Sequence, residues 1–149
     1  AFGPELIVSV RFGSILGTPA VSLPKHGVMN LHSGLLPEYR GIMATFWAMV
    51  RQEARYGFTL HRIVDEGIDT GPIISRQSLP LDLRLDYSTL LANLYREALP
   101  DLVDAIEQVQ QGESLKTRVP KGSGKYFGLP DQTAIERFEG LGYRWWPED

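Results

Sequence analysis

The chain has 149 residues, of which 43% are hydrophobic and 22% are charged, and its formal net charge is -3 at pH 7. These values predict one globular domain, and they give no reason to expect a broad nucleic-acid surface, an anionic-membrane surface or a membrane span. The sequence contains no Cys, which excludes disulfides, thiolate catalysis and cysteine-ligated zinc sites and fits a cytoplasmic protein.

Strand patterns open the chain. Residues 6–10 form a β-branched run typical of a buried parallel strand, and residues 28–32 predict a second strand. After a loop that contains Pro37, the apolar spacing of residues 43–52 predicts an amphipathic helix with Trp47 as its core anchor.

Two further strands are predicted over residues 56–64 and 73–79, joined by the acidic, glycine-bearing loop 65–71. A long helix follows them. The order β, β, α, β, β, α implies an α/β domain with a largely parallel or mixed sheet. Active sites in such sheets lie at the carboxyl ends of strands.

The long helix covers residues 86–112, where apolar residues recur at steps of three and four. Either Asp86 or Ser88 is its expected N-cap. Pro100 lies inside this run, where it removes one hydrogen bond at a cost of about 3 kcal/mol unless the helix adapts. We therefore expect a kink there.

The end of the chain is less regular. Residues 116–127 are rich in Gly and basic residues and predict an extended or mobile arm, and residues 131–141 predict a short helix. Trp145 and Trp146 then indicate docking, either onto the body of the protein or onto a partner.

Asn30 and His32 are the candidate catalytic pair. They are two positions apart in a predicted strand, so both side chains leave the same face. An amide donor beside an imidazole suits a reaction that develops an oxyanion, although polar residues that merely cap a strand are the alternative. Thr59 and His61 share a face of another strand in the same way. Asp69 lies in the acidic loop, where a carboxylate can be held rigidly or can simply be solvated.

A metal site made by His32, His61 and Asp69 is the competing interpretation. Their spacings match no recognisable ligand motif, so we expect no metal.

Four ordered segments of the sequence resemble the folate-dependent formyltransferases. These segments are NLHSGLLP with YRG at residues 30–41, WA at 47–48, GFTLH at 57–61 and DTGPII at 69–74. The resemblance covers residues 6–79, about half of the chain. Ser33 and Gly34 depart from the Gly-Ser or Pro-Ser pair that is frequent in these enzymes, but the Asn and the His are retained.

This resemblance implies a Rossmann-like formyltransferase fold and a formyl donor, 10-formyltetrahydrofolate, with no metal. It also implies that Asn30 and a protonated His32 stabilise the oxyanion. Asp69, close to His32, would raise the pKa of the imidazole and relay the proton of the amine. Thr59 and His61 would lie beside this site. The residues expected to contact the folate are Val10, Arg11, Phe12, Leu36, Val64, Gly67 and Ile68.

Compared with this family, the chain apparently lacks the first βαβ portion. We therefore expect residues 1–149 to be a partial catalytic domain, with residues 113–149 as a carboxy-terminal extension; a naturally short relative is the alternative. The expected acceptor is a small-molecule amine, such as a sugar nucleotide or another metabolite, and tRNA is disfavoured. A 10-formyltetrahydrofolate hydrolase and a non-catalytic folate-binding or interaction module are the alternative functions. The oligomeric state stays open.

Overall fold

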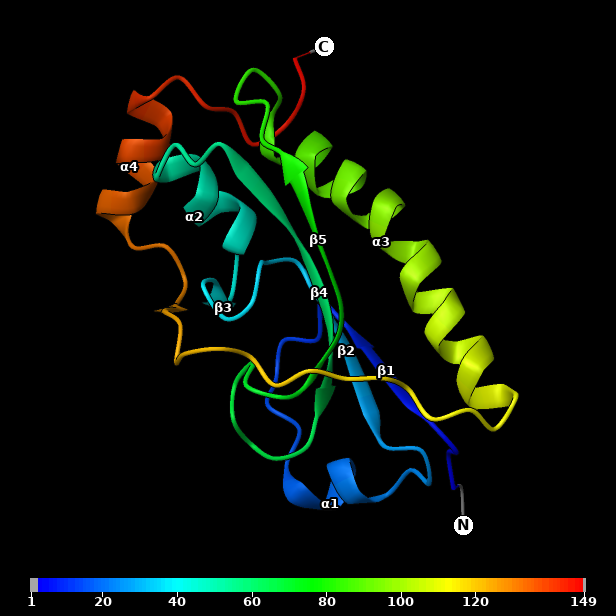
Figure 1. Cartoon of the computed structure of the whole chain (residues 1–149). Coiled ribbons are helices and arrows are strands. Elements are labelled where there is room, and N and C mark those ends of the chain that lie inside the picture. The colour runs from blue at the N-terminus through cyan, green and yellow to red at the C-terminus, as the bar shows by residue number, and fades with distance from the viewer. Residues whose placement is uncertain (1–2, 149) are drawn as a thin grey trace.

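The computed structural model describes residues 3–148. Its elements, in chain order, are β1 (Ile7–Val10), α1 (Thr18–Ser22), β2 (Val28–His32), β3 (Arg40–Gly41), α2 (Ala44–Val50), β4 (Arg55–Ile63), β5 (Ile73–Pro80), α3 (Tyr87–Gln110), β6 (Tyr126–Phe127) and α4 (Gln132–Gly140). The predicted α/β class is confirmed, and Figure 1 shows the helices arranged around one central sheet.

The central sheet has the order β1-β2-β4-β5. Only β1 and β2 are parallel, whereas β2 with β4 and β4 with β5 are antiparallel. The sheet is therefore mixed rather than largely parallel, because the connection between β2 and β4 returns the chain in the opposite direction. The register places Asn30 opposite His61 and His32 opposite Thr59. All four polar residues thus meet on two adjacent strands.

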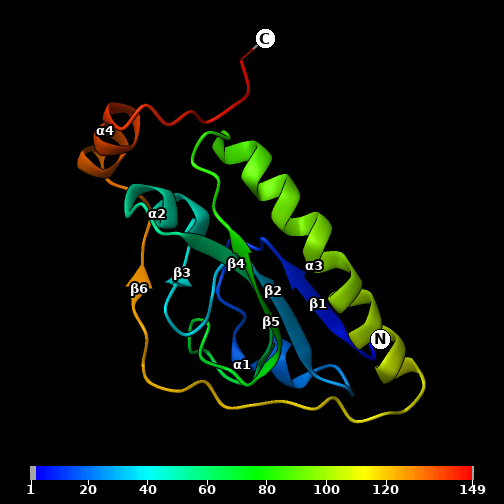
Figure 2. The same cartoon turned by 45° about the horizontal axis from the view of Figure 1, so that its top comes forward.

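Helix α3 lies along the sheet and contacts β4 and β5, while α2 contacts β4, α3 and α4 (Figures 1 and 2). The core between these elements is apolar and well buried. Its largest fully buried side chains include Met29, Phe46, Phe58, Leu60, Leu94 and Phe138. Within residues 3–148, no helix combines the length and the apolar character that crossing a bilayer requires.

The long helix is capped by Asp86, whose side chain accepts a hydrogen bond from the Thr89 amide. Ser88, the other candidate, lies inside the helix and donates to Asp86. Helix α3 runs through Pro100 without ending or restarting. Packing of Leu94, Ala98 and Leu102 against the core offsets the lost hydrogen bond.

The segment between α3 and α4 forms an extended arm, as predicted. We define the arm as residues 113–131. It pairs with β5 at a bridge between Arg118 and Ile73, and its strand β6 pairs in parallel with β3 (Figure 2). After α4, Trp145 stacks on Phe46 and packs on the body, whereas Trp146 is 70% exposed.

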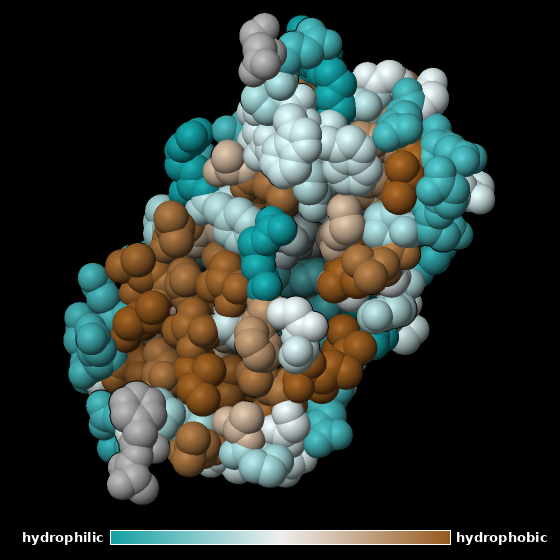
Figure 3. All heavy atoms as spheres, turned by 180° about the vertical axis from the view of Figure 1, so that it is seen from behind, coloured by the Kyte–Doolittle hydropathy of each residue, from teal (hydrophilic) through white to brown (hydrophobic). Residues whose placement is uncertain are grey.

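Strand β1 differs from its prediction as a buried strand. It forms one edge of the described sheet, and its Val8 and Val10 are 37% and 42% exposed. On α3, Leu99 and Val103 are also exposed. Figure 3 shows hydrophobic side chains gathered broadly on the back of the molecule. The strand pattern identified β1 correctly but not its burial, since burial depends on the neighbours that a strand has.

Candidate active site

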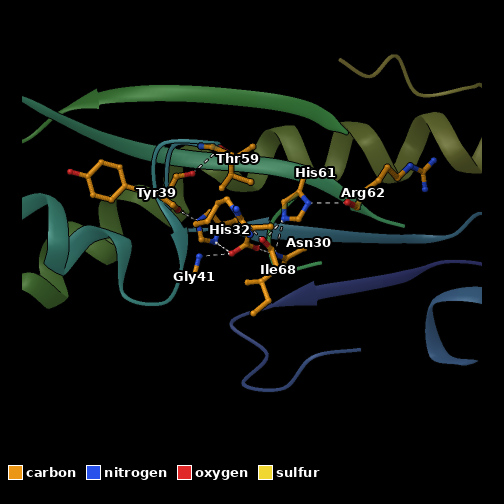
Figure 4. A network of polar contacts seen from close by, with 12 residues as sticks. Asn30, His32, Tyr39, Gly41, Thr59, His61, Arg62 and Ile68 are labelled. Carbon is orange, nitrogen blue, oxygen red and sulfur yellow. Dashed lines mark hydrogen bonds and ion pairs between the residues drawn. The ribbon is translucent and has the colours of Figure 1, made fainter. Parts of the chain in front are cut away.

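Asn30 and His32 leave the same face of β2 at its carboxyl end, as predicted (Figure 4). Their neighbour Leu31 points the other way and is 1% exposed in the core. Because β2 lies between β1 and β4, its backbone is fixed from both sides by ladder hydrogen bonds. The two polar side chains are therefore carried by one of the most constrained strands of the sheet.

The acidic loop between β4 and β5 brings Asp69 to this pair. Asp69 Oδ2 lies 3.6 Å from His32 Nδ1 and accepts a hydrogen bond from the Gly41 amide at 2.8 Å. The residue has a φ of 53°, a left-handed conformation that is uncommon for residues other than Gly but that Asp adopts more readily than most, and such conformations cluster at functional sites. Residues 37 positions apart in the sequence thus meet at one point.

The His32 ring has one defined tautomer. Its Nε2 lies 2.6 Å from the Tyr39 carbonyl oxygen, which can only accept, so Nε2 carries a proton. In the neutral ring, Nδ1 then presents a lone pair beside Asp69. Burial lowers the pKa of His32 from its ordinary value of 6.5, and this effect outweighs the opposing charge of Asp69. The raised pKa that we predicted is therefore wrong, because the loss of hydration outweighs the nearby carboxylate.

His61 orients Asn30 from the neighbouring strand. Its Nδ1 lies 2.9 Å from the Arg62 carbonyl oxygen, and its Nε2 lies 3.1 Å from the Asn30 amide nitrogen and 3.3 Å from Asp69 Oδ1, so one ring nitrogen faces both Asn30 and Asp69. Asn30 also donates to Asp69 Oδ1, at a longer 3.4 Å. The strong contact to His61 thus anchors the amide, while the weaker one to Asp69 is easily exchanged for another acceptor.

Thr59 holds the loop that follows β2. Its hydroxyl donates to the Gly34 carbonyl oxygen at 2.7 Å and accepts from the Leu36 amide at 3.0 Å. Both Thr59 and His61 are therefore beside the candidate catalytic residues, as expected, but they act from buried positions at 0% and 1% exposure. Their contacts position the site.

Asp69 is poised as a carboxylate. Its burial favours the neutral acid, but the contact with His61, the charge of protonated His32 and the Gly41 amide outweigh this effect. The pKa of Asp69 consequently lies below its ordinary value of 3.8. The site therefore combines an ionised Asp with a His that burial keeps neutral near pH 7.

A cavity of about 540 Å³ opens over these side chains. Asn30, His32, His61 and Asp69 all line it. Its volume lies within the usual range for small-molecule sites. In the described part of the chain, no group of three or more His, Asp or Glu side chains is arranged to hold a metal ion.

The predicted folate contacts divide into two groups. Arg11, Phe12, Gly67 and Ile68 line the cavity. The other three are not among the residues that line it: Val10 follows the lining Ser9 on β1, Leu36 is 1% exposed in the core, and Val64 is 57% exposed between the lining residues Ile63 and Asp65. The folate contacts of these three residues stay a prediction. For Val10 the difference follows from the strand, because successive side chains of β1 point to opposite faces of the sheet.

Other lining residues were missed by sequence reasoning. Ile15 and Leu16 come from the loop after β1, Tyr87 and Tyr95 come from α3, and Tyr126 and Leu129 come from the arm. The aromatic residues carried no local signal, since a Tyr on a helix or in an irregular arm usually reflects packing or solvent contact. Only the tertiary fold brings them to the cavity.

Comparisons with known proteins agree with one another. A family model described as formyl transferase matches residues 1–106. A methionyl-tRNA formyltransferase from Deinococcus radiodurans is 31% identical over an alignment of 156 positions that covers 98% of this chain and 48% of that protein. One from Pelobacter propionicus is 37% identical over 125 positions, which cover 78% of this chain and 39% of that protein.

Similar solved structures are also formyltransferases. WlaRD, a sugar 3N-formyltransferase crystallised in the presence of dTDP and 5-N-formyl-THF, has a TM-score of 0.73 and 27% identity, over 83% of this chain and 44% of that one. An N-formyltransferase from Helicobacter canadensis, in complex with folinic acid and dTDP-3-aminofucose, has a TM-score of 0.69 and 28% identity. The alignment covers 82% of this chain and 44% of that one. The chain spans less than half of the length of each of these proteins.

Proposed function

The chain belongs to the formyl transferase family, and on this premise we propose that it transfers a formyl group from 10-formyltetrahydrofolate to the amine of a small-molecule acceptor. The observation that carries the proposal is the convergence of Asn30, His32 and Asp69 on one cavity. The donor would supply the formyl group and a nitrogen leaving group, and no metal is required.

The cavity suits a folate donor. The loop after β1 contributes the apolar Phe12, Ile15 and Leu16, and the acidic loop contributes Ile68 beside Asp69. A flat ring can lie between such apolar walls while backbone groups of the loops bind its polar edge. The structurally similar WlaRD and Helicobacter canadensis enzymes were crystallised with formylated folates, which supports this assignment.

His32 is the proposed base. Its Nε2 proton is committed to the Tyr39 carbonyl oxygen, so Nδ1 is the nitrogen that can accept the proton of the attacking amine. The lowered pKa keeps the ring neutral and ready for this step near pH 7. Asp69, 3.6 Å from Nδ1, then stabilises the imidazolium that forms. This assignment replaces the resting imidazolium that we expected from the sequence.

Asn30 is the proposed electrophilic group. As negative charge develops on the formyl oxygen, the N–H that points to Asp69 at 3.4 Å can also donate to that oxygen. The second N–H remains on His61, which keeps the amide in the correct orientation. A donor aimed in advance costs little reorganisation during the reaction.

A sugar nucleotide or similar small amine is the acceptor that we favour. The neighbour from Helicobacter canadensis was solved with dTDP-3-aminofucose. The formal net charge of -3 provides no broad basic surface for the phosphates of tRNA. The relatives from Deinococcus radiodurans and Pelobacter propionicus are methionyl-tRNA formyltransferases, however. Methionyl-tRNA is therefore the competing acceptor against which a small amine has to be tested.

The test is a transfer assay with 10-formyltetrahydrofolate and either dTDP-3-aminofucose or initiator methionyl-tRNA. We expect the release of tetrahydrofolate to depend on the amino sugar, with a formylated sugar detected by mass spectrometry. Release at the same rate without any amine would identify a hydrolase instead. Folate binding without release would leave a binding module, and formylation of tRNA alone would overturn the acceptor assignment.

A further inference from the structure

We propose that the arm forms a substrate-recognition wall of the active site, in which Tyr126 and Leu129 contact a flat aromatic ring of a bound substrate. This inference rests on the proposed function and deepens it. The arm lies outside the residues matched by the family model, which end at position 106. Both side chains nevertheless line the cavity that holds Asn30, His32 and Asp69.

Arg40 connects the arm to the acidic loop that carries Asp69. Its Nε donates to the Ile68 carbonyl oxygen at 2.9 Å, and its Nη1 donates to the Ser123 carbonyl oxygen at 3.0 Å. One guanidinium therefore links Ile68, the residue before Asp69, to Ser123 in the middle of the arm. The Arg40 backbone amide also donates to the Lys125 carbonyl oxygen at 2.9 Å. The wall and the catalytic carboxylate are consequently held in a fixed relation.

Strand alternation directs Tyr126 toward the cavity. Its neighbour Phe127 is 7% exposed and stacks on Tyr39 at a ring separation of 4.9 Å. Because successive side chains point to opposite sides of a strand, Tyr126 faces outward and is 50% exposed. The Gly128 carbonyl oxygen accepts from Trp47 Nε1 at 3.0 Å, which fixes the next residue as well.

The Tyr126 ring lies directly over Gly41. A Cβ atom at position 41 would come within 2.9 Å of Tyr126 Cε2 and 2.1 Å of the Phe127 carbonyl oxygen, so only Gly permits this contact. Gly41 also has a φ of 98°, which favours Gly. The Gly41 amide donates to Asp69 at 2.8 Å. Gly41 therefore lies between the Tyr126 ring and the Asp69 carboxylate.

The chemistry of this wall suits a planar, largely apolar group. Tyr126 and Leu129 are joined along the cavity by Ile42 and Met43, none of which carries a charge. A half-exposed aromatic ring gains most from stacking on another ring. Two sources can provide it: the aminobenzoyl ring of the folate donor, or the base of a nucleotide-linked acceptor.

The test measures the two affinities separately. Binding of 5-formyltetrahydrofolate and of dTDP-3-aminofucose is followed by calorimetry for the wild-type chain, Tyr126→Ala, Tyr126→Phe and Leu129→Ala. We expect Tyr126→Ala to weaken one of the two ligands roughly tenfold, with Tyr126→Phe close to wild type. The ligand that is weakened identifies the ring. Val119→Ala is the matched control, because Val119 lies on the same arm, is 80% exposed and does not line the cavity.

The outcomes are distinct. Unchanged affinities for both ligands in Tyr126→Ala and Leu129→Ala would overturn the recognition wall while leaving the proposed function intact. Wild-type protein that binds neither ligand would overturn the proposed function and this inference together. Unfolding temperatures of all variants show whether the fold is retained, and Leu129, at 75% exposure, offers a substitution with little packing to lose.

Discussion

The two walls of the cavity are built in different ways. One wall consists of the regular strands β2 and β4, whose continuous ladder fixes Asn30, His32 and His61 in register. The other is the irregular arm, which is held by the short β3–β6 pairing and by single side chains such as Arg40 and Trp47. The proposed catalytic residues are therefore carried by a continuous ladder, whereas the proposed recognition residues are carried by a segment with few contacts to the sheet, among them the bridge between Arg118 and Ile73.

Among substitutions in the wall formed by β2 and β4, replacement of the proposed base His32 should produce the largest effect on turnover. We expect His32→Gln to reduce the turnover of formyl transfer by about 10² to 10⁴-fold, the usual contribution of a positioned base. Affinity for 5-formyltetrahydrofolate should stay within about threefold. Steady-state kinetics and calorimetry measure the two quantities, and an equal loss of both would mean that His32 only shapes the binding site.

Asn30→Ala should have the next largest effect. Removing one donor to a developing oxyanion costs about 2.7 to 4 kcal/mol of transition-state stabilisation, which corresponds to a 10²- to 10³-fold loss of kcat. The KM for the folate should change little, because the bond to the formyl oxygen strengthens during the reaction. A raised KM with unchanged kcat would place Asn30 in ground-state binding instead.

The site residues on β2 and β4 were largely predictable from the sequence, and those on the arm were not. Asn30 and His32 share a strand face because of a local period of two, and motif resemblance added Asp69. Nothing local indicated that Gly41 would hold Asp69, that Tyr39 would fix the His32 tautomer or that burial would lower the His32 pKa. Tyr126 reaches the cavity only because the arm returns to β3, a long-range pairing with no sequence period.

The pH dependence of stability provides a smaller test. The pKa of His32 is lower in the folded protein than its ordinary 6.5, so the unfolded chain takes up that proton first and stability falls as the pH drops through about 6.5. Asp69, whose pKa lies below 3.8, adds stability that is lost on further acidification. Urea unfolding between pH 8 and 5 should show a slope below about 1.4 kcal/mol per pH unit from His32. His32→Gln should flatten it, and an unchanged slope would contradict the assignment.

Trp47→Phe should give the smallest effect, confined to the arm. It removes the hydrogen bond to Gly128 and should lower the free energy of unfolding by about 1 kcal/mol. Hydrogen exchange should accelerate at the Ile42 amide, which donates to Phe127, but not along β2. Trp146→Phe, at a position 70% exposed, is the control and should change neither. Faster exchange along β2 would show that the two walls are not independent.

The central claim is that Asp69 acts with His32 in formyl transfer, and a single-turnover experiment tests it most directly. Asp69→Asn keeps the size of the side chain and removes its charge, while Asp104→Asn makes the same change at an exposed position of α3. We predict that formyl transfer from 10-formyltetrahydrofolate slows at least roughly 100-fold in Asp69→Asn, with folate affinity retained and Asp104→Asn unaffected. An undiminished rate in Asp69→Asn would contradict the account.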